Sequence, residues 1–179
     1  MKKGLILVLA LVLLLGGAGF LYGRLSTKVD TEQLGQQEEN RIAAPDFLVY
    51  NGEEGEVQLS DFFGKPIVLN FWASWCGPCK MEMPDFEAKY LELGDKVQFL
   101  MVNMTAGSET QESAQEFIDA EGFTFPVFFD LDSDAAYTYG ASSLPTTYFI
   151  DADGYVVAQA VGAIDADTLQ QGIDLIREE

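Results

Sequence analysis

The sequence predicts an α/β fold in which helices flank a mixed central β-sheet. In the middle of the chain, apolar and β-prone runs alternate with helical segments, an order typical of parallel strands joined by right-handed crossovers. Near the C-terminus, two strand candidates are separated only by Asp151-Ala152-Asp153-Gly154, which predicts an antiparallel hairpin. The segment that contains these elements is long enough to form one hydrophobic core.

The first half of this domain is predicted to begin with a hairpin and to continue into a buried strand. Residues 47–50 and 56–59 flank a turn rich in Asn and Gly, which predicts a β-hairpin. Ile67–Trp72 is almost continuously apolar, as expected of a strand buried on both faces. A helix at Gly77–Leu93 and a second buried strand at Val97–Asn103 follow.

The second half of the domain is predicted to add three helices and three strands. The segment before Gly122 predicts a helix that ends at this glycine. The elements are expected in the order helix 109–121, strand 127–129, helix 132–139, strands 146–150 and 155–161, and closing helix 165–177.

The N-terminus predicts a membrane anchor outside this domain. Gly4–Tyr22 carries no charge and is long enough to span a bilayer as a helix. A cleaved signal peptide is the alternative, but the sequence offers only a loose small-residue cleavage site. We therefore predict a signal anchor over residues 1–23, a linker over 24–44 and the folded domain over 45–179. Two basic residues lie on each side of the apolar stretch, so charge alone does not set its orientation.

The composition excludes several classes of function. The formal net charge is −19, which repels nucleic-acid phosphates and anionic lipid surfaces. The chain contains no His, so it lacks the commonest acid–base residue and metal ligand. Its two Cys residues cannot by themselves close a tetrahedral zinc site. We expect no metal and no cofactor apart from a redox-active disulfide.

Cys76-Gly77-Pro78-Cys79 lies where the strand at 67–72 is predicted to run into the helix at 77–93. The partial positive charge at a helix N-terminus stabilises a thiolate, and Pro fits the first helical turn. We expect Cys76 to be exposed and to attack a substrate disulfide. Cys79, one turn further on, is expected to be more buried and to resolve the mixed disulfide. Gly77 and Pro78 set the turn between them.

The WCGPC motif, preceded by VLNFWAS, resembles the thioredoxin active site. The runs APDF, LSDFFGKPIVLNFWASWCGPCKMEMP, VNMT, FPVFFD, SLPTTYFID and DADG are similar to the TlpA/ResA-type branch of membrane-anchored thioredoxin-like proteins. The resemblance covers about residues 43–177. It implies a thioredoxin-like fold with an N-terminal hairpin and a central helix–strand insert, here residues 104–130. It also implies a single-pass protein of the cell membrane with an extracytoplasmic catalytic domain.

The resemblance also implies partners and direction. Members of this family keep thiols of other proteins reduced, often those of apocytochrome c, and draw electrons from a membrane thiol donor. The Gly-Pro dipeptide between the cysteines resembles the reducing end of the thioredoxin scale. We therefore expect a protein-disulfide reductase. A peroxiredoxin-like peroxidase and a non-enzymatic copper carrier remain as alternatives.

Further site residues follow from the resemblance, one position at a time. Pro145 matches the family's cis-proline, which would place the backbone of Leu144 beside Cys76, ready to pair with an extended substrate chain. Trp75 is expected to form part of the surface that substrate meets.

Two polar residues are expected to manage the proton of Cys79. Thioredoxins carry a buried Asp, the proton acceptor for the second Cys, where this chain has Asn70, which does not titrate. Glu82 matches an acidic residue of the family near the Cys pair, and a partly buried carboxyl there would have a raised pKa and shuttle the proton of Cys79. A surface glutamate is the alternative reading of Glu82. Asn70 either supports the site by hydrogen bonding or is a satisfied polar residue of the core.

Overall fold

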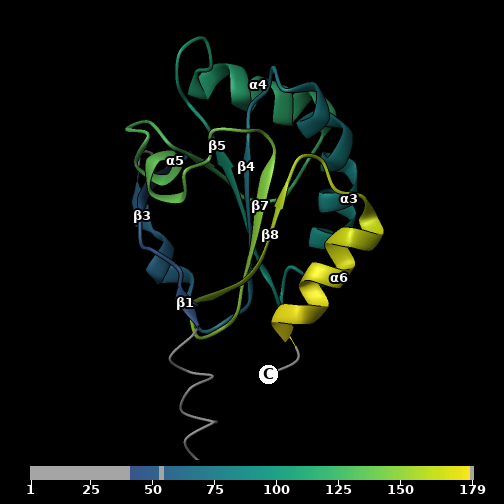
Figure 1. Cartoon of the computed structure of the whole chain (residues 1–179). Helices are drawn as coiled ribbons and strands as arrows, with labels where there is room; N and C mark the ends of the chain where they lie inside the picture. Colours follow the sequence, from purple (N-terminus) through teal and green to yellow (C-terminus); the bar gives the residue numbers. More distant parts are fainter. Residues whose placement is uncertain (1–40, 53–54, 178–179) are drawn as a thin grey trace, which may run out of the picture. The chain divides into compact units, whose positions relative to one another are not determined.

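A mixed eight-stranded sheet forms the centre of the computed structural model, which describes residues 41–52 and 55–177 (Figure 1). The strand order is β1-β8-β7-β4-β5-β6-β2-β3. The three neighbours β4, β5 and β6 run parallel, and every other neighbouring pair is antiparallel. This arrangement confirms the predicted α/β class with its mixed sheet.

The elements lie close to their predicted positions. In chain order they are β1 (Ile42–Ala43), β2 (Leu48–Asn51), β3 (Glu56–Gln58), the 3₁₀ helix η1 (Leu59–Phe62), β4 (Ile67–Trp72), α3 (Gly77–Leu93), β5 (Gln98–Asn103), α4 (Gln111–Glu121), β6 (Val127–Phe129), α5 (Asp134–Tyr139), β7 (Thr146–Ile150), β8 (Tyr155–Val161) and α6 (Ala166–Arg177). The hairpin β2–β3 and the insert of α4 and β6 are both present, as the resemblance implied. Helix α4 begins two residues later than predicted, because Thr110 caps it and Glu109 lies outside it.

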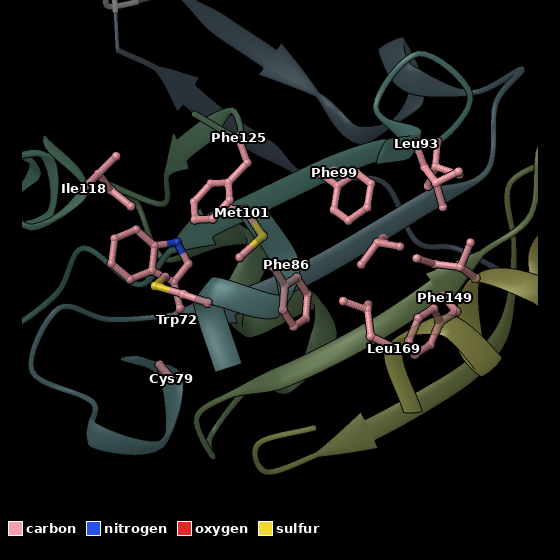
Figure 2. Packing of buried hydrophobic residues seen from close by; sticks show 14 of the residues in the cluster. Trp72, Cys79, Phe86, Leu93, Phe99, Met101, Ile118, Phe125, Phe149 and Leu169 are labelled. Carbon is pink, nitrogen blue, oxygen red and sulfur yellow. The ribbon is translucent and has the colours of Figure 1, made fainter. Parts of the chain in front are cut away.

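Strand β4 is buried on both faces because a different hydrophobic cluster covers each face. Trp72 belongs to the cluster that includes residues of α3, α4 and α6, whereas Phe71 belongs to the cluster on the α5 and η1 side. Figure 2 shows Cys79 and Trp72 at one end of the first cluster and Phe149 and Leu169 toward the other. The β4–α3 junction is therefore anchored by core packing on both sides of the sheet.

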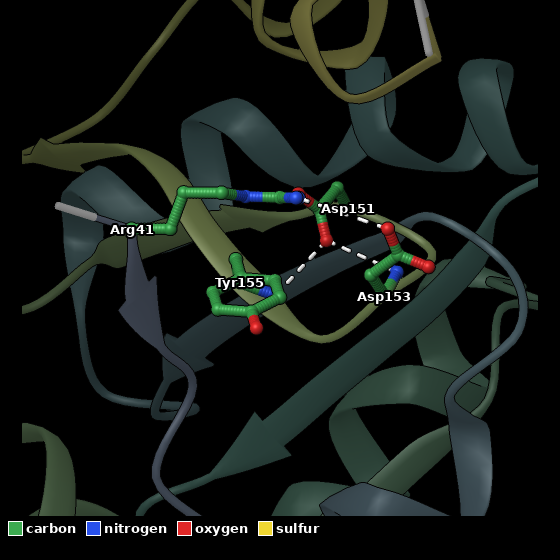
Figure 3. A network of polar contacts seen from close by, with 4 residues as sticks. All are labelled: Arg41, Asp151, Asp153 and Tyr155. Carbon is green, nitrogen blue, oxygen red and sulfur yellow. Dashed lines mark hydrogen bonds and ion pairs between the residues drawn. The ribbon is translucent and has the colours of Figure 1, made fainter. Parts of the chain in front are cut away.

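Arg41, Ile42 and Ala43 belong to the domain, although the sequence predicted its start at residue 45. Ile42 and Ala43 pair with β8, so the linker predicted over residues 24–44 overlaps the sheet at its end. Arg41 forms an ion pair with the buried Asp151 and lies over the ring of Tyr155, 4.0 Å from its centroid (Figure 3). The second Asp151 oxygen accepts hydrogen bonds from the backbone of Asp153 and Tyr155.

The predicted anchor over residues 1–23 and most of the predicted linker lie outside the described residues. Among the residues that the structure describes, no helix is long and apolar enough to cross a membrane.

Candidate active site

The active-site cysteines lie where β4 ends and α3 begins. Residues 73–76 form a tight turn in which the Cys76 N–H donates to the Ala73 carbonyl at 3.1 Å. Cys76 is the N-cap of α3, and its sulfur accepts a hydrogen bond from the backbone N–H of Cys79 at 3.2 Å. Pro78 occupies the first helical turn, where its missing N–H costs no intrahelical bond. The sulfur of Cys76 therefore lies in the positive field of a helix N-terminus.

Cys76 and Cys79 form a disulfide, and both are buried. Cys79 is fully covered, as predicted, because it lies in the core cluster beneath the sheet's end. The prediction that Cys76 is exposed is wrong for this oxidised state, since only 4% of the residue is accessible. The disulfide bond to Cys79 covers one side of Cys76. The other residues that line the same pocket cover much of the rest.

A largely apolar groove of about 380 Å³ leads to the disulfide. Three chain segments line it: Trp75, Cys76, Gly77 and Pro78 from the active-site turn, Met104 and Ala106 from the loop after β5, and Ala141, Ser142 and Leu144 from the loop before β7. Trp75 is 62% exposed, an unusual state for such a large apolar side chain outside a binding surface. The groove thus brings Trp75, Gly77, Pro78 and Leu144 of the predicted site together.

The loop before β7 carries a cis peptide bond between Leu144 and Pro145. Pro145 is buried, and its carbonyl accepts a hydrogen bond from Gly162 at 2.8 Å, which ties the loop to the end of β8. Leu144 is half-buried and contributes to the groove wall. The antiparallel pairing of Phe71 with Thr146 explains why this loop lies beside the β4–α3 junction.

Glu82 lies one turn beyond Cys79 on α3 and is 2% exposed. One carboxylate oxygen accepts a hydrogen bond from Asn70 Nδ2 at 2.8 Å, and the other accepts the N–H of Ile164 at 2.9 Å. Burial raises the pKa of Glu82 to about 7, although these two hydrogen bonds act in the opposite direction. A carboxyl with this pKa gains and loses protons near neutral pH.

Asn70 is fully buried and also donates to Thr147 Oγ1 at 3.0 Å. Its own oxygen has no hydrogen-bond partner in the structure. Glu82 does not line the groove that leads to the disulfide; it lines a separate hollow of about 250 Å³ together with Asp85, Asp165 and neighbouring residues of the loop before α6. Glu82 thus lies beneath a surface hollow that is separate from the groove.

Sequence reasoning missed Glu109, a buried carboxylate at the back of the active-site turn. It is 4% exposed and accepts hydrogen bonds from the backbone N–H and the hydroxyl of Ser74, both at 2.8 Å. The sequence offered one indication of its role, which is its position directly before Thr110, the N-cap of α4. An acidic residue at that position predicts the start of a helix and gives no sign of a buried hydrogen bond to a distant segment.

The whole domain matches known proteins. A model of the AhpC/TSA family matches residues 41–159. The thioredoxin-like protein YneN of Bacillus subtilis (strain 168) is 36% identical and aligns over 98% of this chain and 99% of its own length. The thiol-disulfide oxidoreductase ResA of Bacillus thuringiensis (strain Al Hakam) is 35% identical over 95% of each chain.

A solved structure agrees with these matches. The pneumococcal exposed lipoprotein thioredoxin of Streptococcus pneumoniae superimposes with a TM-score of 0.63 at 31% identity. The alignment covers 73% of this chain and 100% of that structure. This domain therefore shares its fold with that lipoprotein thioredoxin over the whole length of the solved structure.

We predict that Glu82 makes stability depend on pH. Its folded pKa of about 7 lies above the ordinary value of 4.5, so the folded state binds more protons than the unfolded state between these values. The free energy of unfolding then falls as pH rises from about 4.5 to about 7, by about 3 kcal/mol from this group. Urea unfolding of the oxidised protein at pH 5 and pH 8 measures the change. Glu82→Gln should remove this component, and equal pH slopes in both proteins would contradict the assignment.

Proposed function

Because the chain belongs to the AhpC/TSA family and, within it, to the ResA-type thiol–disulfide oxidoreductases, we propose that it reduces disulfides in other proteins outside the cytoplasm. The thiol–disulfide oxidoreductase activity follows from the family and from the disulfide itself. The observation that carries the proposal is the position of this disulfide, at the N-terminus of α3 and at the end of an apolar groove.

The proposed reaction begins with both cysteines reduced. The Cys76 thiolate, stabilised by the N-terminus of α3, attacks one sulfur of a substrate disulfide, and the other substrate sulfur leaves as a thiolate. The Cys79 thiolate then attacks the Cys76 sulfur, and the second substrate thiolate leaves. The substrate has gained two electrons, and the protein holds the Cys76–Cys79 disulfide seen in the structure. A membrane thiol donor would return the two electrons.

The groove supports a substrate that is an extended polypeptide with an apolar side chain near its cysteine. Trp75, Met104 and Leu144 offer apolar surface, and none of the described residues that line the groove is charged. The loop carrying Leu144 lies next to Cys76 in the same groove, so the backbone of a substrate chain that pairs with this loop would bring its sulfur to Cys76. Apocytochrome c, whose haem-binding cysteines lie in an unfolded chain, fits this description.

Glu82 is proposed to accept the proton of Cys79 during resolution. Cys79 is enclosed by apolar side chains, which disfavours its thiolate, and a base on the next turn would offset this. The contacts of Asn70 suit both protonation states of Glu82. The amide nitrogen donates to the carboxylate, and after a half-turn of the amide its oxygen would accept from the neutral acid and from Thr147.

Attachment to the cell membrane is part of the proposal. The alignment with YneN spans 98% of this chain and therefore includes most of the apolar N-terminal stretch. The structural relative from Streptococcus pneumoniae is named an exposed lipoprotein thioredoxin. Both observations support an N-terminal anchor with an extracytoplasmic domain.

The site disfavours the peroxidase alternative, although the family model is named after AhpC and TSA. A peroxidatic cysteine needs a Thr and an Arg nearby, and Ala73, Ser74 and Trp75 precede Cys76. Among the described residues the arginines are Arg41 and Arg177, and neither lines the groove. Peroxide consumption by the reduced protein would restore this alternative, and stoichiometric copper binding would favour the carrier.

We predict that the Cys76–Cys79 couple is reducing. Equilibration of the full chain with thiol buffers of known potential, followed by the fluorescence of Trp72 and Trp75, gives the reduction potential. A value near about −270 mV, that of thioredoxin, is expected for a reductase. A value near about −120 mV would identify an oxidant and reverse the proposed direction.

We predict that Cys79→Ser traps substrate proteins. Without the resolving thiol, the mixed disulfide at Cys76 persists, because no internal nucleophile releases the substrate. Non-reducing gels of envelope extracts incubated with the reduced variant should show adducts that reductant dissolves. Cys76→Ser is the matched control and should form no adducts and reduce insulin no faster than background. If both variants formed comparable adducts, Cys76 could not be the sole attacking cysteine, and the assigned roles would be wrong.

We predict that Glu82→Gln slows resolution more than attack. The Gln side chain is similar in size but accepts no proton, so the lifetime of the mixed disulfide at pH 7 should increase about 10²-fold. The difference should shrink as pH rises, because hydroxide then removes the Cys79 proton without the help of Glu82. Acid-quenched single-turnover reactions separate the two steps. Equal mixed-disulfide lifetimes in the variant and the parent would show that Glu82 has no part in proton transfer.

A further inference from the structure

Glu109 is a buried carboxylate beside the active-site turn, and the proposed mechanism gives it no part. Its Oε1 accepts hydrogen bonds from the backbone N–H of Ser74 and from Asn103 Nδ2, and its Oε2 accepts the Ser74 hydroxyl, each at 2.8 Å. Glu109 therefore accepts three hydrogen bonds while it is 4% exposed, and it links two segments that are far apart in the sequence.

The two segments joined by Glu109 are two walls of the groove. Ser74 lies in the turn that presents Trp75 and Cys76 to the groove. On the other side, Glu109 closes the loop after β5, where its N–H donates to the Ala106 carbonyl at 3.1 Å. Met104 and Ala106 of this loop form the facing wall.

The loop after β5 is held at its start by a backbone hydrogen bond from the Met104 N–H to the Trp72 carbonyl at 2.8 Å. Residues 106–108 are exposed. Gly107 has a φ of +66°, and glycine, which lacks a Cβ, restricts the backbone of the loop less than other residues do. Asn103 shares the network, since its Oδ1 accepts the Thr105 hydroxyl at 2.9 Å. Glu109 adds the contact that joins the other end of this loop to the active-site turn at Ser74.

We propose that Glu109 is a positioning residue that sets the width of the groove and thereby the binding of protein substrates. The inference rests on the proposed function, because it takes the groove as the site that receives a polypeptide. A small disulfide needs only the Cys76 sulfur, so its reduction does not depend on the facing wall. A protein substrate must contact both walls at once, so loosening the tie weakens its binding.

Two substrates and two variants test this proposal in the full reduced chain. Stopped-flow fluorescence of Trp72 and Trp75 would follow oxidation by insulin and by hydroxyethyl disulfide over a range of concentrations. For Glu109→Ala, we expect KM for insulin to rise about tenfold or more with little change in the maximal rate. The rate with hydroxyethyl disulfide should stay within about twofold of the parent rate.

Glu109→Gln distinguishes the hydrogen bonds of this side chain from its negative charge. A Gln oxygen can accept from Ser74 N–H and Asn103, and its amide nitrogen can donate to the Ser74 hydroxyl, so this variant should restore the parent KM for insulin. Ser74→Ala keeps the backbone bond and loses the hydroxyl bond, and should raise KM for insulin about threefold. This milder variant decides the matter if Glu109→Ala does not fold.

Three results would overturn the inference. An unchanged KM in Glu109→Ala, or in Ser74→Ala where that variant decides, would show that the tie does not set the groove. Equal losses with both disulfides would place the effect on Cys76 itself. A Gln variant as impaired as the Ala variant would show that the negative charge matters and the tie does not. A parent protein that reduces neither disulfide would instead refute the proposed function.

Discussion

The contact between the Cys76 sulfur and the N-terminus of α3 is the constraint on which the rest of the active site depends. It requires that a helix begin directly after a strand, and β4 fixes where this happens because both of its faces are covered by core. The neighbours of β4 then place the remaining walls. Trp72 pairs with Asn103 and Phe71 with Thr146, so the loop after β5 and the loop before β7 both open beside the disulfide.

Two buried carboxylates lie near this junction and are satisfied in different ways. Glu109 accepts three hydrogen bonds and connects segments of the chain. Glu82 accepts two, and burial raises its pKa to about 7, so it holds its proton through part of the physiological range. A buried group that accepts many hydrogen bonds is suited to holding geometry, whereas a poorly solvated carboxyl is suited to exchanging a proton. In the proposed mechanism these two tasks fall to two residues of the same type.

Elements with a strong local pattern were predictable from the sequence, and contacts between distant segments were not. The bounds of β4 and α3 match the prediction, because a continuous apolar run and a Gly-Pro helix start are local features. β1 was missed because two residues show no periodicity and pair only with β8. Glu109 was missed for the same reason, since its partner Ser74 is 35 residues away. The burial of Cys76 depends on walls contributed by three separate loops.

The ion pair between Arg41 and Asp151 fastens the edge strand β1 at a defined end of the sheet. Arg41 binds Asp151 in the turn that follows β7, whereas Pro145 precedes β7 at the strand's other end, where the disulfide lies. Arg41 and the reactive sulfur therefore lie toward opposite ends of β7. A force applied at Arg41 is borne by this ion pair and by the pairing of β1 with β8, far from the disulfide.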